Sequence, residues 1–517
     1  MATVAALPGN PAEHPSPNGG TTQHKGLAHW MGRVLKELDN LRQSPDKDAV
    51  HDLRVAIRRC RSVGAVMREV DPDPAWHELR RVPKKLFRKL GELRDTQIMS
   101  QWVKEHSAEN DKLRAQLEEM FQEQEPKLTE EAVRLAEKFD EKGWKRLDRK
   151  LRKRMSLVPA GSLAAQCLAV ERLNEAKSLH GKALRVEKPE NWHNLRIGLK
   201  KFRYTVESLL PEQYEGWSEK LKQVQDLLGE VHDLDVLKAI IQQKASDETV
   251  DLRAEWERTM DRERAARLQE YREVAIGKNS MWQEWTPALP QHERLQLAAL
   301  ARLRATARAM DAHRRRAACV SRLSVALFDA LAHVHAAPIF ANHDMRRILR
   351  AAARLSGLRV KGARGPQRKA ARRFLHELPT PPSWTRRQWE LLAWTVRYHR
   401  GGEPKDKANA FSRLHEDQQR DVRMLAGIVR LARGLRKCDV GEWAEFPAEK
   451  TAVAIILDVP GLTDSAGNAA KLAAAKHLLE TSLGRALILR AAPGTRTENV
   501  VALPSRREDT PIAEASD

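Results

Sequence analysis

Along most of the chain, apolar residues recur three and four positions apart, which is the period of an amphipathic helix. Clear examples are GLAHWMGRVLKELDNLR (26–42), WHELRRVPKKLFRKLGELRD (76–95) and EAVRLAEKF (131–139). The strict alternation that is typical of half-buried strands is scarce. The pattern therefore predicts a mainly α-helical fold that begins near residue 26 and continues to about residue 275.

Breaks in this pattern divide the chain. Residues 1–25 are rich in Pro, Gly, Ser and Asn, and we expect them to be disordered. The stretch IGKNSMWQEWTPALPQHE interrupts the helical period, so 276–294 is predicted to be a linker. A second domain is expected at 295–495 and a loose tail at 496–517.

The second domain is also predicted to be mainly helical, but its end differs. TAVAIIL (451–457) has the composition of a buried strand, AGNAAKLAAAKHLLETS (466–482) that of a helix, and RALILRA (485–491) that of a second strand. This order predicts a small βαβ-like appendix to the helical domain.

One motif occurs twice. HDLRVAIRRCR (51–61) and HNLRIGLKKFR (193–203) both place a histidine first and cations 3, 7 and 10 residues later. On a helix these offsets fall within a stripe roughly 80° wide. Like charges so spaced repel by a few tenths of a kcal/mol per pair, so a row kept twice suggests that an extended anion compensates the charge. For any single basic helix, a solvated surface is the better explanation; the repetition favours a binding site.

The repeat extends beyond this helix. LGELRD (90–95) follows the first copy, and LGEVHD (228–233) follows the second. We therefore expect two related antiparallel helical halves, at about 26–160 and 161–275. Packed about a pseudo-twofold axis, they would place the two basic stripes across a central channel.

The overall charge supports an anionic partner without identifying it. Lys and Arg number 91 against 70 Asp and Glu, a net charge of +21. Nucleic acid, an anionic membrane and a free polyanion are all compatible with this charge. Only 5% of residues are aromatic and no DNA-binding motif is visible, so specific nucleic-acid recognition is not expected. No run of 18 apolar residues is present, so no membrane association is expected.

The cysteines and histidines do not suggest a cofactor. The four cysteines are scattered singly, which argues against a disulfide framework or a zinc site and favours a reducing, cytoplasmic location. Adjacent His-Asp pairs at 51–52 and 232–233 lie among arginines that would repel a divalent cation. We expect neither a metal nor an organic cofactor.

The two motif pairs, HDLRVAIRRCRS with LGELRD and HNLRIGLKKFRY with LGEVHDLDVL, resemble those of the CHAD family, the conserved-histidine α-helical domain. The resemblance covers about residues 26–275. It implies two helical bundles around a basic, histidine-containing pore, binding of inorganic polyphosphate, and association with polyphosphate granules. The implied phosphate contacts are His51, Arg54, Arg58, Arg61, His193, Arg196, Lys200 and Arg203, with Lys84, Lys85, Arg88, Arg94 and His232 as further candidates.

Residues 295–495 resemble the C-terminal HD-type helical domain of the exopolyphosphatase and guanosine-pentaphosphate phosphatase family. The metal-binding His-Asp pair of such a site is replaced here by Leu355-Ser356-Gly357, and Arg433 stands where a later aspartate would be. We therefore expect this domain to be non-catalytic and accessory, with Arg397, His399 and Arg400 as anion contacts.

Three functions remain open from the sequence. The first is a polyphosphate-binding protein that acts beside polyphosphate-metabolising enzymes. The second is a metal-dependent polyphosphate or nucleotide phosphatase, and the third is a non-specific nucleic-acid binder. If His51 and His193 border the bound phosphate, binding should strengthen between pH 8 and about pH 6.

Overall fold

The computed structural model describes residues 26–244, 250–310, 314–360, 362–404, 409–440, 445–463 and 465–492. The predicted disordered segment 1–25 and tail 496–517 lie outside these residues. The described chain is mainly helical with one small sheet near its C-terminal end, which confirms the predicted fold class. It forms two compact units: the described residues up to 314 with Gly357–Glu390, and Arg315–Ser356 with the described residues from Leu391 onward.

The first unit contains the predicted repeat. Its first half comprises α1 (Leu27–Gln43), α2 (Lys47–Met67), α3 (Pro74–Arg81), α4 (Lys84–His106), α5 (Lys112–Glu137) and α6 (Glu141–Met155). Its second half comprises α7 (Leu163–Arg185), α8 (Pro189–Leu209), α9 (Pro211–Lys244), α10 (Val250–Ala275) and α11 (Met281–Trp285). The unit also includes α12 (His292–Met310) and α16 (Gln367–Glu377).

Local sequence explains where several of these helices begin. The side chain of Asp46 accepts hydrogen bonds from the backbone N–H groups of Asp48 and Ala49, which caps α2. Asp73 caps α3 in the same way, through the N–H of Ala75. Pro83 separates α3 from α4, because proline cannot donate the backbone hydrogen bond that would join them into one helix.

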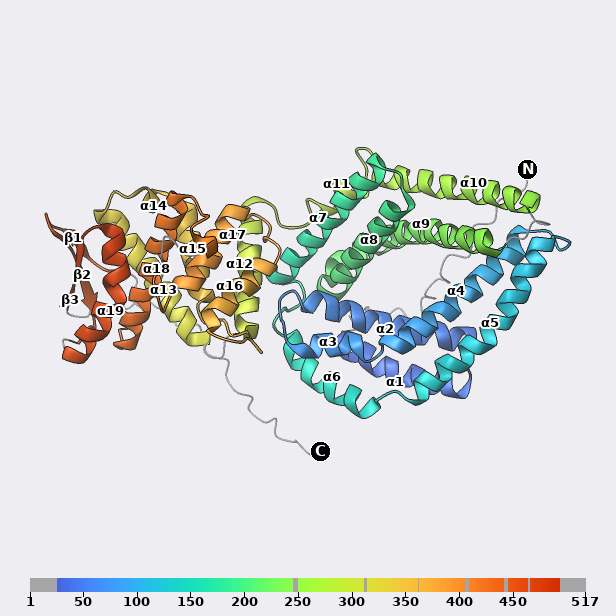
Figure 1. Cartoon of the computed structure of the whole chain (residues 1–517), viewed down its shortest axis with the longest axis horizontal. Helices are drawn as coiled ribbons and strands as arrows, with labels where there is room; N and C mark the ends of the chain where they lie inside the picture. Colours follow the sequence, from blue (N-terminus) through green and yellow to red (C-terminus); the bar gives the residue numbers. More distant parts are fainter. Residues whose placement is uncertain are drawn as a thin grey trace, which may run out of the picture. The chain divides into compact units, whose positions relative to one another are not determined.

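The two halves pack their helices in the same order (Figure 1). In the first half α1 packs on α2, α2 on α4 and α4 on α5. In the second half α7 packs on α8, α8 on α9 and α9 on α10. The halves meet where α2 packs on α8, so the two helices that carry the repeated motif lie next to each other.

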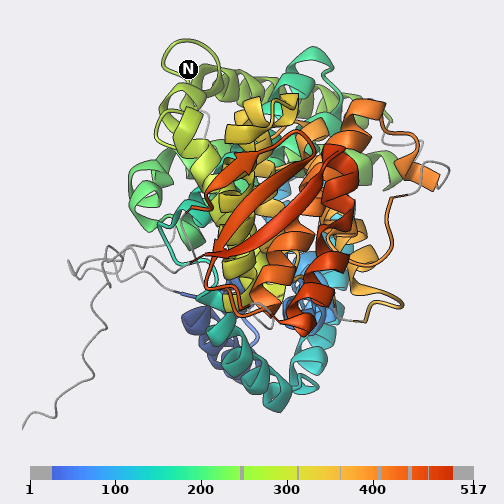
Figure 2. The same cartoon turned by 90° about the vertical axis from the view of Figure 1, so that its left-hand side faces the viewer.

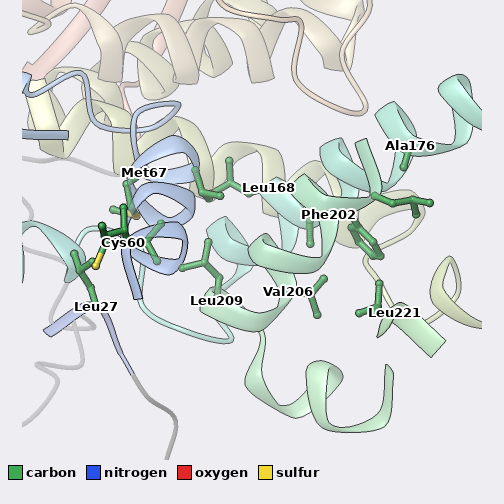
Figure 3. Packing of buried hydrophobic residues seen from close by; sticks show 14 of the residues in the cluster. Leu27, Cys60, Met67, Leu168, Ala176, Phe202, Val206, Leu209 and Leu221 are labelled. Atoms are coloured by element: carbon green, nitrogen blue, oxygen red, sulfur yellow. The ribbon is translucent and has the colours of Figure 1, made fainter. Parts of the chain in front are cut away.

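A large apolar core holds the two halves together. Figure 3 shows part of it, with Cys60 and Met67 from α2 and Phe202 and Val206 from α8. These side chains occupy the faces of α2 and α8 that lie away from the charged stripes, as the helical period requires. The core therefore fixes the direction in which both basic stripes point.

The segment predicted to be a linker takes part in this core. Trp285 of α11 is fully buried and packs near Phe202 and Trp217. The following helix, α12, packs on α7, and its buried Arg302 forms an ion pair of 2.9 Å with Glu171. Residues 281–310 thus extend the first unit. The sequence suggested a boundary here because Pro, Gly and Asn interrupt the helical period, although Trp282 and Trp285 supply anchors.

The second unit is smaller. It contains α13 (Arg314–Val334), α14 (Pro338–Ala341), α15 (His343–Leu355), part of α17 (Arg386–Tyr398), the 3₁₀ turn Asn409–Phe411, α18 (Glu416–Lys437) and α19 (Ala466–Leu483). Its strands are β1 (Ala448–Lys450), β2 (Ala454–Pro460) and β3 (Ala486–Ala492).

The sheet confirms the predicted βαβ appendix and adds one strand to it. β2 and β3 pair in parallel, with Ile455 opposite Leu487, and α19 is the crossover between them. Gly484 ends α19 with a φ of 64°, a conformation that glycine adopts without strain. The short strand β1 pairs antiparallel with β2. Figure 2 shows the three strands side by side.

One segment of the second unit, Arg315–Val334 within α13, is long and apolar enough to cross a membrane by length and composition. Of its most apolar window, 61% is buried within the protein. A mostly buried core helix meets the same criteria, so this feature is weak evidence for a membrane span.

Candidate anion-binding site

The first unit encloses a cavity of about 290 Å³ between α2, α4, α8 and α9. Each half therefore contributes the helix with the His/Arg motif and the helix with the LGE motif. The wall includes eight Lys or Arg side chains and five Asp or Glu side chains. The basic members are Arg54, Arg58, Arg59, Arg94, Arg196, Lys200, Arg203 and Lys222.

The two basic stripes predicted from the sequence line this one cavity. Six of their eight residues are in its wall: His51, Arg54, Arg58, Arg196, Lys200 and Arg203. Since 142 positions separate equivalent members in the sequence, only the packing of α2 on α8 brings them together. Of the further candidates, Arg94 also lines the cavity.

Several arginines of the cavity wall have a buried N–H donor for which the described part of the protein provides no acceptor. The buried Nε atoms of Arg58, Arg94, Arg196 and Arg203 make no hydrogen bond within the described part of the protein. A buried N–H without an acceptor costs about 1–3 kcal/mol, so an acceptor supplied by water or by an anionic ligand would stabilise these side chains. Forked guanidinium donors match carboxylate and phosphate oxygens best.

The residue at the centre of the second stripe is held in an unusual protonation state. Burial, reinforced by the charges of Arg196 and Arg58, lowers the pKa of Lys200 to about 7. At neutral pH this ammonium is therefore only partly charged. A bound polyanion would favour its charged form, since an opposite charge nearby raises the pKa of an amine.

Equivalent carboxylates from the two LGE motifs also lie in the wall. Burial raises the pKa of Asp95, and burial together with the nearby Asp95 charge raises the pKa of Asp233 to about 6. Asp95 lies 4.0 Å from a terminal nitrogen of Arg54. The charges of Arg196 and Lys200 act on both aspartates, so both are placed to balance the charge of basic side chains.

The histidines are less simply placed than the sequence suggested. His193 and His232 do not line the cavity but contact each other, with their Nδ1 atoms 3.2 Å apart, so one ring must donate and the other accept. Burial and the charge of Arg196 lower the pKa of both rings, that of His232 to about 4. His51, in the wall, contacts Asp52 at 3.4 Å, and burial with the charge of Arg94 lowers its pKa.

Besides His193 and His232, four sequence candidates lie outside the cavity wall. Arg61 donates to the backbone oxygen of Arg80 and stacks on Phe87, 4.8 Å from the ring centre. Lys84, Lys85 and Arg88 are exposed on α4. They cannot touch a ligand held wholly within the cavity, although they border the same helices.

The cavity contains residues that the sequence did not single out. Arg59, Tyr204, Tyr214, Ser218, Lys222 and Asp226 are among them. Lys222 could have been found, because it lies 138 positions after Lys84, the same offset as the two LGE motifs. Tyr214 gave no signal, since its place in the wall depends on the N-terminal extension of α9.

In the second unit, the three predicted anion contacts are not equivalent. His399 is 2% exposed, its Nδ1 bonds to the backbone oxygen of Val396, and burial lowers its pKa to about 3. A neutral, buried ring cannot act as a surface anion contact. The sequence gave no sign that position 399 is internal. Arg400 is exposed, and Arg397 stacks on Tyr398 at 4.8 Å.

Potential metal ligands are dispersed. Among the described residues, no group of three or more His, Cys, Asp or Glu side chains is arranged to hold a metal ion. The nearest His pair, His193 and His232, has Arg196 and Lys200 beside it, and these charges oppose a cation.

Comparison with known proteins identifies one domain within the first unit. No curated protein matches the chain. Among solved structures, it is similar to the crystal structure of the CHAD domain from the plant Ricinus communis, at 19% identity and a TM-score of 0.37, over 48% of this chain and 88% of that chain. The family model of the CHAD domain matches residues 26–242, which include both His/Arg motifs and both LGE motifs. Residues 26–242 are therefore a CHAD domain.

Proposed function

We propose that this protein binds inorganic polyphosphate in the cavity between α2, α4, α8 and α9. The observation that carries the proposal is the convergence of both basic stripes on one cavity, with buried arginine Nε donors that lack protein acceptors. CHAD domains are associated in general with polyphosphate binding, which agrees with this chemistry.

The shape of the site favours a thin linear anion. A cavity of about 290 Å³ is at the lower end of the range for small-ligand pockets, so a folded macromolecule cannot enter it. Its cations come from both sides rather than from one surface, as an anion surrounded by donors requires. A nucleic acid would have to bind outside the cavity, through charge alone.

A phosphatase activity is the weaker candidate. Hydrolysis of a phosphoanhydride needs a positioned nucleophile and usually metal ions. The cavity carboxylates Asp95 and Asp233 face arginines, which suit charge balance better than metal binding. Release of orthophosphate from polyphosphate upon addition of Mg²⁺ or Mn²⁺ would establish the activity nonetheless.

The second unit is proposed to be accessory. Residues 295–495 resemble the exopolyphosphatase C-terminal domain, but the metal ligands of that domain are replaced here. We therefore propose no catalytic role for the second unit. Association with polyphosphate granules in the cytoplasm, and with polyphosphate-metabolising enzymes, follows from the same proposal. Granule association can be checked by fluorescence microscopy of the tagged protein in cells with and without polyphosphate.

The direct test replaces one arginine from each stripe. Arg54→Gln with Arg196→Gln should weaken polyphosphate binding by at least about a hundredfold, because each change removes a charge-assisted contact of about 1.5–3 kcal/mol. Lys145→Gln with Arg149→Gln, on exposed positions of α6, removes the same number of charges and should leave the affinity nearly unchanged. Equal affinity of the folded stripe variant and the wild type would refute the proposal.

A further inference from the structure

The two repeats differ at the positions that lead into the cavity. The LGE motifs align α4 with α9 at an offset of 138 residues. Positions 0, 4, 7 and 11 on one helical face are Lys84, Arg88, Gly91 and Asp95 in α4, and Lys222, Asp226, Gly229 and Asp233 in α9. All four of these α9 residues line the cavity, but of the four α4 residues only Asp95 does so. Lys222 and Asp226 thus belong to the cavity wall, whereas Lys84 and Arg88, at the equivalent positions of α4, lie outside it and are exposed.

The exposed part of α4 adjoins the cavity wall. Gly91 faces Arg54 so closely that a Cβ atom there would lie 2.5 Å from Nη1 of that arginine. One turn earlier, the ring of Phe87 lies under the Arg54 guanidinium. The distance from Cζ of Arg54 to the centre of the ring is 5.2 Å. Lys84 and Arg88 flank Phe87 on the exposed side. Arg54 and Phe87 therefore link the cavity wall to the part of α4 that carries these two cations.

Two further cations stand beside this path. Arg61, the member of the first stripe that lies outside the cavity, stacks on the same Phe87 ring. Arg80 is close enough to Arg61 that its charge helps to lower the pKa of Arg61, after the larger effect of burial. Arg61, Arg80, Lys84 and Arg88 form a basic ridge over the end of α3 and the start of α4; this set is called the α3–α4 ridge below.

The corresponding positions of the second half carry a different charge. Arg81 and Arg88 of the first half become Glu219 and Asp226, and Arg80 becomes Ser218. Both carboxylates are in the cavity wall. An anion leaving the cavity towards α9 would meet negative charge, while one leaving over α4 would meet the α3–α4 ridge. Charge therefore favours one exit.

Size makes an exit necessary for a long chain. A cavity of about 290 Å³ holds only a short stretch of a linear polyanion. The remainder must lie on the surface, where it binds only if further cations follow. Arg88, with 72% of its side chain exposed, is held only at 3.5 Å by Glu92 and remains available to solvent.

Resting on the proposed function, we infer that polyphosphate binds with one terminal stretch in the cavity and its body across the α3–α4 ridge. The ridge then selects for chain length, because short oligophosphates are satisfied by the cavity alone. The first repeat provides the basic exit, and the carboxylates of Glu219 and Asp226 oppose an exit on the second repeat.

The experiment compares two ligands on full-length protein. Lys84→Gln with Arg88→Gln should weaken the binding of long-chain polyphosphate by about tenfold and reduce the salt dependence of that binding, because phosphate contacts are lost. The binding of tripolyphosphate should not change. Both affinities are measured by competition in calorimetric titrations, after circular dichroism has shown that the variant is folded.

The matched control is Lys145→Gln with Arg149→Gln, which has the same residue types and spacing on α6, away from the cavity wall. It should leave both affinities unchanged. Three results would each refute the role of the α3–α4 ridge: an unchanged long-chain affinity in the ridge variant, an equal loss for both ligands, or an equal loss in the control. Failure of the wild type to bind either ligand would instead overturn the proposed function.

Discussion

Arg54 of α2 and Gly91 of α4 are in direct contact at the cavity wall, where any side chain at position 91 would collide with the guanidinium. A Cβ atom on Gly91 would lie 2.5 Å from Nη1 of Arg54, whereas one on the equivalent Gly229 would meet nothing within 4 Å. The absence of a side chain at position 91 thus allows Arg54 to occupy its place in the cavity.

This contact makes Gly91→Ala a test of the position of Arg54. The obstructing atom is the far end of a flexible side chain, so the fold should tolerate the methyl group while Arg54 moves aside. We expect polyphosphate affinity to fall by about tenfold, the equivalent of ~1.4 kcal/mol, with little change in melting temperature. Gly229→Ala should retain the wild-type affinity. A similar loss of affinity in both variants would show that displacement of Arg54 is not its cause.

Binding should strengthen as the pH falls from 8 to about 5.5. Lys200, with a pKa of about 7, gains its charge in the upper part of this range, and Asp233, with a pKa of about 6, loses its charge in the lower part. Both changes make the cavity more positive. Lys200→Met should flatten the affinity profile around pH 7, and Asp233→Asn should flatten it around pH 6. Wild-type binding that is independent of pH would contradict this account.

Histidines should contribute little to that profile, contrary to what the sequence alone suggested. Burial and neighbouring cations lower the pKa values of His51, His193 and His232, that of His232 to about 4, so these rings are less protonated in the free protein than free imidazoles at the same pH. His193→Gln with His232→Gln should keep the rise in affinity between pH 8 and pH 6. If the same titrations show that this variant lacks the rise in affinity, the histidines are responsible for the pH dependence.

The cationic wall should cost stability in the ligand-free protein. Lys200→Met removes an amine whose pKa in the folded state lies below its usual value. Because of this amine, the folded wild-type protein binds fewer protons than its unfolded state between about pH 7 and pH 10. The variant should therefore be more stable by roughly 1–2 kcal/mol below pH 7, with the gain vanishing towards pH 10; cavity water limits its size. Chemical denaturation at pH 6 and pH 10 measures both values, and a destabilised variant at pH 6 would be the contrary result.

The second unit offers a packing test that does not involve the cavity. Gly427 of α18 lies against α19, and a Cβ atom there would be 2.9 Å from the Cα of Leu479. Because backbone cannot move aside cheaply, Gly427→Ala should cost about 1–3 kcal/mol. Gly467→Ala in α19, where a Cβ meets nothing within 4 Å, should be neutral or slightly stabilising. Thermal unfolding of the two variants should differ accordingly.

Much of the site could be predicted because its sequence signal is repeated. The His/Arg and LGE motifs occur twice with matching offsets, and the helical period assigns each residue a direction. Six of the eight stripe residues consequently line the cavity. The family model confirms the CHAD domain over residues 26–242.

The remaining features depend on packing that spacing does not encode. Arg61 and Arg203 occupy the same offset, yet only Arg203 lines the cavity, because α9 continues unbroken where Pro83 interrupts the first half. His399 looked like a surface contact and is buried. Trp282 and Trp285 lie in a stretch rich in helix breakers, but their burial makes that stretch part of the core.

The central claim is that the paired stripes form a shaped polyphosphate site rather than a generic basic surface. The most direct measurement titrates labelled long-chain polyphosphate with the protein at about 0.15 M salt, near physiological screening, and then adds excess duplex DNA. Retention of polyphosphate in the presence of DNA is the result expected here, since DNA cannot enter the cavity. Free displacement of polyphosphate by DNA would contradict it.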